Sequence, residues 1–392
     1  MARRYQVISA DSHLDINPDL WTHHVPAKFR DQAPRVVRLE NGADAITIGD
    51  GRPSQVGFVI HIADVPRSEL HKQVLTFETA SGAGTPERRL REQDQDGVDA
   101  EILFSRVQMF RRAKDAEAFL ALNRAYNEYL VEEYQAAAPN RLFPLGVIPT
   151  SGTDDAVREL EYCARAGFKG VLLDRFPSGK GFPTPDDDRF WSASIDLNMP
   201  ISHHTNAGST RMAAVNEPTF AYTKGVGGDG EEGSLGSDPM RHWYFRFCGD
   251  AACAPLQMAF AGVWDRFPKL QIYWAETMIG WLKYALRQID DHYERYKYMA
   301  EDLYGIDELE RQPSDYFKEH CLWGFLSDPT GVADRNAIGV DRLMWGSDFA
   351  HAASDWPHSR EVIERDFVSV PGDERHLMLA GNAMRFFHLD DS

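Results

Sequence analysis

The 392-residue chain has few cysteines, no long apolar run and no cluster of basic residues. Its four cysteines form no Cys-x-x-Cys pair, which disfavours a cysteine-based zinc or redox site and favours buried thiols at Cys163, Cys248, Cys253 and Cys321. No stretch approaches the roughly 18 apolar residues of a membrane-spanning helix, and the residues after Met1 do not resemble a secretory signal. We therefore expect a soluble, cytoplasmic protein.

Positive charge is also scarce, with 42 lysines and arginines against 60 aspartates and glutamates and a formal net charge of -18. Nucleic acids and anionic membranes are polyanions that require a basic surface, so neither is expected as a partner. Hydrophobic residues make up 43% of the chain, which is enough for a substantial core and excludes disorder. We expect a globular protein that acts on a small-molecule substrate and forms a homodimer or a higher oligomer.

Short apolar runs recur along the chain, and most of them are followed by a helical pattern. The runs that we predict to be strands are Tyr5–Ala10, Ala100–Ser105, Leu142–Ile148, Gly170–Asp174, Pro200–His204, Leu270–Ala275, His320–Phe325 and Arg342–Trp345. Alternation of strand and helix is typical of parallel sheets. The pattern predicts an α/β protein with a (β/α)8 TIM-barrel fold, and we expect residues 1–392 to form a single domain.

Two helices between these strands have clear ends. Ala116–Ala138 carries apolar residues on one helical face and stops at Pro139. Asp155–Ala166 ends at Gly167, a residue suited to the left-handed conformation that follows many helices. Each helix leads directly into the next predicted strand.

Two segments interrupt the alternation. Residues 34–87 contain two short strand-like runs around Asn41-Gly42, which predicts a β-hairpin inserted after the first strand. Residues 206–239 are rich in glycine and follow the fifth strand, so we expect a mobile lid over the carboxyl ends of the strands, with a plain flexible loop as the alternative.

Four of the predicted strands end in acidic or imidazole side chains: Asp11 and His13, His203 and His204, Glu276, and Asp348 and His351. Alone, each is a weak signal, since Asp11 and His13 could be a solvated pair and Glu276 or Asp348 could cap a helix. Adjacent residues on a strand face opposite ways, so only one of the two neighbouring histidines should point inward. Together they lie where α/β barrels hold their active sites, which indicates a metal-dependent enzyme.

With these motifs the chain resembles the amidohydrolase superfamily, in particular its amidohydrolase-related branch. That branch includes aminocarboxymuconate-semialdehyde decarboxylase and the resorcylate-type decarboxylases. The resemblance rests on Asp11-Ser12-His13, on Pro200-Ile201-Ser202-His203-His204, on Ala275-Glu276 and on Gly346-Ser347-Asp348. It implies a metal held by Asp11, His13, His204 and Asp348. Where the family's decarboxylases carry a catalytic histidine, this chain has Glu276.

The resemblance and the residues together define the expected site. Catalytic roles are predicted for Asp348, Glu276 and His351, and Glu276 is also a candidate metal ligand. Substrate contacts are predicted for His203, Asn206, Trp21, Arg106 and Arg246. One divalent ion is expected, with zinc first, manganese or iron as alternatives, and a second metal left open.

The first interpretation of function is hydrolysis of a small carboxylated or cyclic metabolite by metal-activated water. Three alternatives remain open. The chain could be a non-oxidative decarboxylase of the same family, a non-haem iron oxygenase on the same fold, or a non-catalytic subunit of such an enzyme.

Overall fold

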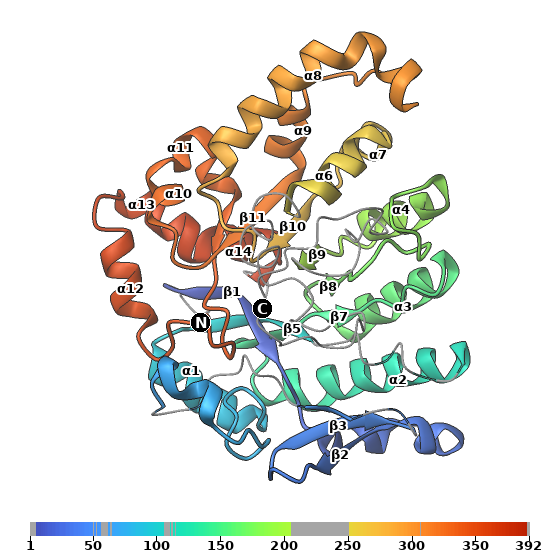
Figure 1. Cartoon of the computed structure of the whole chain (residues 1–392), viewed down its shortest axis with the longest axis vertical. Coiled ribbons are helices and arrows are strands. Elements are labelled where there is room, and N and C mark those ends of the chain that lie inside the picture. Colours follow the sequence, from blue (N-terminus) through green and yellow to red (C-terminus); the bar gives the residue numbers. More distant parts are fainter. Residues whose placement is uncertain are drawn as a thin grey trace.

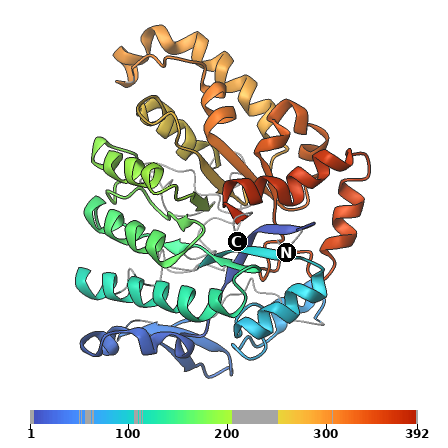
Figure 2. The ribbon, with the colours of Figure 1, turned by 180° about the vertical axis from the view of Figure 1, so that it is seen from behind.

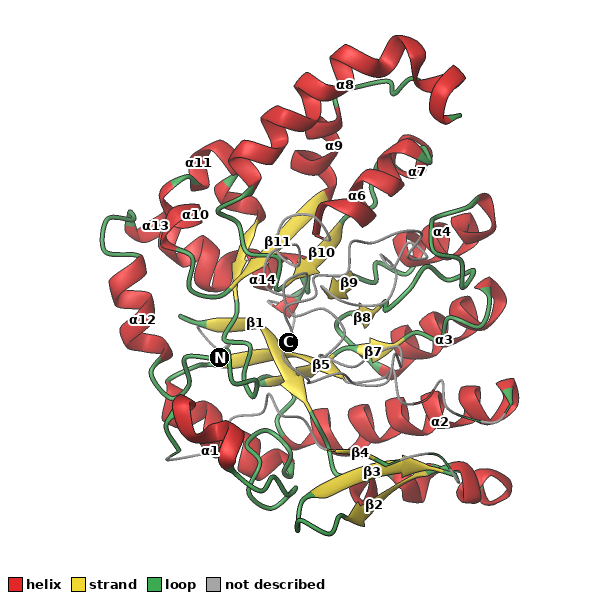
Figure 3. Cartoon of the chain, in the orientation of Figure 1, coloured by secondary structure: helices red, strands yellow, loops and turns green. Residues whose placement is uncertain are grey.

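The computed structural model describes residues 5–49, 51, 53–55, 62, 65–105, 110, 113, 115–204, 251–305 and 307–389. The strands are β1 (Ile8–Leu14), β2 (Pro34–Arg38), β3 (Asp44–Ile48), β4 (Ser54–Gln55), β5 (Ala100–Ser105), β6 (Leu142–Pro144), β7 (Gly146–Val147), β8 (Val171–Leu172), β9 (Ile201–His204), β10 (Ile272–Ala275), β11 (Cys321–Phe325) and β12 (Leu343–Trp345). The parallel strands lie inside a surround of helices, and β2 and β3 lie at the edge of the molecule below α2 (Ala116–Tyr129), as Figures 1 and 3 show.

The α-helices pack outside the parallel strands, as the view from behind also shows (Figure 2). They are α1 (Pro86–Asp96), α2 (Ala116–Tyr129), α3 (Thr153–Ala166), α4 (Asp188–Asp196), α6 (Ala251–Phe260), α7 (Val263–Arg266), α8 (Leu282–Tyr304), α9 (Pro313–His320), α10 (Pro329–Ala333), α11 (Arg335–Ile338), α12 (Ser359–Asp366), α13 (Gly372–His376) and α14 (Asn382–Phe386). Of the helices in the described ranges, none is both long and apolar enough to cross a membrane.

The parallel strands follow the order of an α/β barrel. One sheet has the order β1-β5-β6, and a second has the order β7-β8-β9-β10-β11-β12. Leu145 joins β6 to β7, and its amide donates to the carbonyl of Leu103 in the first sheet, while the amide of Gly146 donates to Gly170 in the second. Every predicted strand is present, and the predicted run Leu142–Ile148 is split into β6 and β7.

Contacts between the ends of β1 and β12 join the first and last strands. The amide of Asp348 donates to the carbonyl of Asp11 at 2.8 Å, and the amide of Ser347 donates to Ser9 Oγ at 2.8 Å. The hydroxyls of Ser9, Ser12 and Ser347 lie 2.9–3.1 Å from one another in the buried interior. This closure brings residues from both ends of the chain to one place.

The insertion after β1 has the predicted hairpin. β2 and β3 pair antiparallel, with Val36 opposite Ile46, and β3 also pairs with β4. A second apolar cluster packs Leu75 and Phe77 of the insertion with Trp356 from the C-terminal part of the chain. The predicted lid, residues 206–239, lies outside the described residues.

The helix predicted over Ala116–Ala138 is not uniform. It is α-helical to Tyr129 and continues as a π turn over Leu130–Gln135, in which hydrogen bonds join residues five apart. In a regular α-helix, residues five apart point about 140° from each other. The wider turn instead lets both Tyr129 and Tyr134 pack in the core, with ring centroids 6.3 Å apart.

Burial of the thiols is confirmed for two of the three cysteines that the structure describes. Cys163 and Cys321 are buried, and burial raises the pKa of the Cys163 thiol well above its ordinary value. Cys253 is partly buried, and Cys248 lies outside the described residues.

Candidate metal centre

The first two site residues lie inside β1 rather than beyond its end. The strand was predicted to end at Ala10, but it continues to Leu14 and pairs His13 with Phe104 of β5. A register irregularity between Ser9 and Ser12 lets the strand carry the polar Asp11 without interrupting the sheet. The strand boundary was therefore wrong, whereas the common direction of Asp11 and His13 was right.

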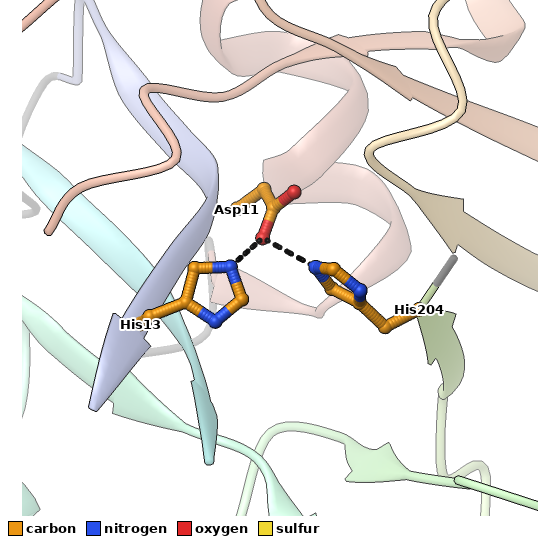
Figure 4. A group of neighbouring side chains, drawn as sticks. All are labelled: Asp11, His13 and His204. Atoms are coloured by element: carbon orange, nitrogen blue, oxygen red, sulfur yellow. Dashed lines mark ion pairs between the residues drawn. The ribbon is translucent and has the colours of Figure 1, made fainter. Parts of the chain in front are cut away.

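Asp11 lies between two imidazole rings, one from β1 and one from β9 (Figure 4). Its Oδ1 atom is 3.5 Å from His13 Nε2 and 3.7 Å from His204 Nε2. The two rings meet edge to face with centroids 4.9 Å apart. The three side chains offer ligand atoms that all lie within 4.8 Å of one another, which is close enough for a single metal ion to bind all three.

Asp348 follows β12 and links His13 to a further histidine. Its Oδ1 atom lies 3.0 Å from His13 Nε2 and 2.7 Å from His351 Nδ1, and the rings of His13 and His351 stack with centroids 3.8 Å apart. Asp348 has a left-handed backbone with φ of 55° and lies three residues beyond the end of the strand at Trp345. His13, Asp348 and His351 form a second group with metal-binding spacing, so the two groups share His13.

The pKa values of the two histidines beside Asp348 are shifted in opposite directions. Burial, together with the neighbouring His351, lowers the pKa of His13 to about 4. Burial also disfavours the charged forms of His351 and Asp348. However, the charge and hydrogen bond of Asp348 raise the pKa of His351, and the two histidines hold the pKa of Asp348 well below its usual range. A neutral His13 suits metal ligation, while a protonated His351 is suited to donate a proton.

Glu276 directly follows β10 and faces the same cluster. The side chain is 2% exposed, and its Oε2 atom lies 3.4 Å from His204 Nε2. Its alternative role as a helix cap belongs to another residue, because Asp328 Oδ2 accepts hydrogen bonds from the amides of Ile279 and Gly280 at 2.8 and 2.7 Å. Glu276 therefore contributes a third buried carboxylate to the site.

The donor set fits a divalent cation. Both carboxylate oxygens of Asp11 and the Oδ2 atom of Asp348 are buried and find no hydrogen-bond partner among the described residues. Buried carboxylates require a compensating charge, and no lysine or arginine is paired with either one in the described ranges. Asp11, His13, His204 and Asp348 could hold the ion, with Glu276 beside them.

The predicted substrate-contact residues have different positions. His203 points toward Trp274, with ring centroids 5.0 Å apart, and burial lowers the pKa of His203 to about 4. Trp21 is buried and packs edge to face on Phe110 and Tyr126. Asn206, Arg106 and Arg246 lie outside the described residues. Substrate contact by these residues stays a prediction.

Sequence analysis missed a buried ion pair that supports the site. Arg89 of α1 is 1% exposed and forms a two-pronged contact with Glu101 of β5 at 2.8 and 2.9 Å. The same guanidinium donates to the carbonyl of His13 at 2.8 Å and to that of Phe349 at 3.4 Å. The charged sequence around Arg89 reads as a solvated helix face, so it gave no signal of this role.

The sequence is similar to those of known proteins. The amidohydrolase family model matches residues 23–389. Decarboxylase orsB from Emericella nidulans is 31% identical over 238 residues, which is 59% of this chain and 66% of that protein, or just under two thirds of its length. The 2-amino-3-carboxymuconate-6-semialdehyde decarboxylase from Dictyostelium discoideum is 20% identical over 317 residues, covering 80% of this chain and 79% of that protein.

A similar solved structure has the same fold and carries a metal. It is the dihydroxybenzoic acid decarboxylase from Polaromonas sp. JS666, determined with manganese and the inhibitor 2-nitroresorcinol. It aligns with a TM-score of 0.64 at 19% identity and covers 99% of this chain and 98% of that one. The family model matches most of the sequence, and the resemblance inferred from the residues is confirmed. The chain is an enzyme that belongs to the amidohydrolase family.

Proposed function

We propose that this enzyme catalyses the non-oxidative decarboxylation of a small carboxylated aromatic acid. The observation that carries the proposal is the row formed by His13, Asp348 and His351, in which an imidazole that is not itself a candidate metal ligand lies 2.7 Å from the carboxylate of a residue that is. The relatives named as decarboxylases support this reaction over hydrolysis, which was the first interpretation of the sequence.

The metal would be held by Asp11, His13, His204 and Asp348. When bound, a divalent ion supplies positive charge that orients and stabilises an anionic substrate oxygen. Three carboxylates near the ion favour manganese or iron over the zinc first expected, and the manganese in the similar solved structure favours manganese among them.

Decarboxylation requires a proton at the carbon that loses carbon dioxide. The pair of Asp348 and His351 is suited to hold that proton, because Asp348 stabilises the charged imidazole through their 2.7 Å contact. Protonation of the ring carbon lets the electron pair of the breaking carbon–carbon bond return to the ring as carbon dioxide leaves. Glu276 faces His204, and in our proposal it orients that ligand and the substrate.

The reaction is tested with manganese-loaded protein and a panel of hydroxylated benzoic acids, including 2,6-dihydroxybenzoate and 5-carboxyvanillate. Decarboxylation in deuterium oxide places one deuterium on the carbon that held the carboxyl group. Hydrolysis of esters, lactones or amides in ¹⁸O-labelled water would instead place ¹⁸O in the product. Label in the hydrolytic products, with no carbon dioxide from any acid of the panel, would refute the proposal.

The site roles are tested with Glu276→Gln, which keeps the shape and removes the charge. We expect turnover to fall by about 100-fold or more with little loss of melting temperature, the scale of a lost catalytic proton-handling or charge-positioning group. Glu361→Gln changes an exposed glutamate of α12 and is the matched control. A normal rate with full metal content in Glu276→Gln would reject a role for Glu276, whereas loss of metal would identify it as a ligand.

A further inference from the structure

A second group of metal-binding side chains lies on the surface and shares no residue with the candidate metal centre. It consists of His23 and His24, in the short 3-10 helix Thr22–His24, and Glu133, in the π turn after α2. Both His23 Nε2 and His24 Nε2 lie close to the same carboxylate oxygen, Glu133 Oε1, at 2.8 and 2.9 Å. The three ligand atoms fall within 4.8 Å of one another.

The π turn creates this arrangement. Glu128 and Glu133 are five residues apart, so in a regular α-helix they would point about 140° away from each other. The π turn brings residues five apart onto the same side of the helix. As a result His24 contacts both carboxylates, with Nε2 at 2.9 Å from Glu133 and Nδ1 at 3.9 Å from Glu128.

The two nitrogens of His24 thereby have different surroundings. The 2.9 Å contact with the Glu133 carboxylate places a proton on Nε2, whereas Nδ1 lies 3.9 Å from Glu128. An ion that replaces the proton on Nε2 would leave Nδ1 protonated and facing Glu128, which is the usual arrangement around metal-bound histidines. Two ligands that are each about 2.0 Å from a tetrahedral ion are about 3.3 Å apart. The nitrogen-to-oxygen distances of 2.8 and 2.9 Å therefore need to lengthen by only about half an ångström to admit an ion.

The charge of the group also suits a cation. Burial opposes ionisation, but the hydrogen bonds from His24 and His23 outweigh it and lower the pKa of Glu133. The side chains of His23 and Glu133 are 57% and 46% exposed, so an ion and its waters can reach them from solvent. His24 is only 14% exposed and is held against α2, with its ring 6.3 Å from that of Tyr129.

We propose that His23, His24 and Glu133 form a peripheral zinc site, with Glu128 orienting His24. Two imidazoles and a carboxylate are typical zinc ligands, and a fourth position is open to water. The ion fastens the segment that follows β1 to the end of α2. His23 lies ten residues after the candidate metal ligand His13 along the chain.

The test uses full-length protein whose central site has first been saturated with manganese. Zinc is then titrated by equilibrium dialysis at pH 7.5, and bound zinc and manganese are counted by elemental analysis. We expect the wild-type chain to bind one additional zinc with a micromolar or tighter dissociation constant. His23→Asn and Glu133→Gln should each weaken this binding at least 10-fold, because each removes one of three ligands.

The matched control is His358→Asn. His358 is an exposed histidine whose Nδ1 lies 3.3 Å from Glu361, so it has one carboxylate partner but belongs to no metal-binding group among the described residues. This variant should bind the additional zinc as the wild type does. Zinc should also raise the melting temperature of the wild type and of His358→Asn, but not that of His23→Asn.

Two outcomes would overturn the proposal. One is the absence of an additional zinc in the wild-type chain at 50-fold molar excess, and the other is equal zinc affinity in wild type, His23→Asn and Glu133→Gln. Circular dichroism of each variant in chelator verifies that it is folded. Because His23 is exposed, its replacement leaves the fold intact and the comparison valid.

Discussion

Replacing Arg89 with methionine tests whether the buried ion pair positions the candidate metal ligands as well as stabilising the fold. Methionine fills much of the same space but, among the described residues, leaves the Glu101 carboxylate with only Gln93 as a buried partner, at 2.9 Å. It also removes the donors to the carbonyls of His13 and Phe349, which flank the ends of β1 and β12. We therefore expect both lower stability and weaker metal binding.

The magnitudes follow from burial. Removing one partner of a buried ion pair costs about 3–5 kcal/mol of unfolding free energy, and Arg89 and Glu101 are 1% and 2% exposed. The entropy of unfolding of a chain of this length is about 0.8 kcal/mol/K, so the melting temperature should fall by about 4–6 °C. Loss of an outer contact to a metal ligand typically weakens metal affinity by about 10–100-fold.

Two further variants separate the two effects. Arg124→Met breaks a similar two-pronged contact with Glu159, at 2.7 and 3.1 Å, between α2 and α3 and away from the metal ligands. It should lower the melting temperature without changing metal affinity. Adding Glu101→Leu to Arg89→Met removes the stranded charge and should recover stability but not metal affinity. Equal metal dissociation constants in wild type and Arg89→Met, measured by competition with a chelating dye, would refute the positioning role.

Two other changes have defined outcomes. Burial raises the pKa of Asp96 from 3.8 to about 6 although Ser359 donates two hydrogen bonds to it. The folded protein then holds this proton more tightly than the unfolded chain, so unfolding free energy falls as the pH rises from about 4 to about 6, by up to about 3 kcal/mol. In urea unfolding, the unfolding free energy of Asp96→Asn should exceed that of wild type by this amount above pH 6 and should be almost equal to it near pH 4. A difference that does not depend on pH would contradict the raised pKa of Asp96. Gly346→Ala places a Cβ 2.6 Å from Asp11 Cβ and 2.9 Å from the amide nitrogen of Asp11. This variant should therefore displace β12 from β1 and lower the metal content. A Cβ at Gly181 would have nothing within 4 Å, so Gly181→Ala should keep the metal content of wild type. Full metal content in purified Gly346→Ala would show that the two strands tolerate the separation.

The strands were predictable because a parallel strand that is buried on both faces appears in the sequence as a short apolar run. The polar residues that end such runs could be recognised for the same reason. Ala100–Ser105 is buried at every position and was found with its correct bounds. The hairpin was predictable from Asn41-Gly42, since few residues suit such a turn. Asp11, His13, His204, Glu276 and Asp348 were brought together as expected, because the carboxyl ends of parallel strands meet at one side of a barrel.

The features that were missed depend on contacts between distant residues. β1 extends past Asp11 because Ser12, His13 and Leu14 pair with residues of β5. The local sequence around β1 gives no sign of this pairing. The amides before α8 are capped by Asp328, a residue nearly fifty positions away, so Glu276 looked like a candidate cap. The π turn also follows from packing, since Tyr129 and Tyr134 both enter the core only when the turn is widened.

Because β12 closes against β1, the candidate metal centre combines residues that are synthesised at the beginning and near the end of translation. Asp11 and His13 are synthesised first, but Asp348 and the amides that pair with β1 leave the ribosome only near the end of translation. Until then the edge of β1 that faces β12 has no neighbour, and its two early ligands cannot form the complete cluster. The complete candidate metal centre can therefore form only near the end of synthesis. A chain whose translation stops before residue 348 lacks Asp348 and cannot form it.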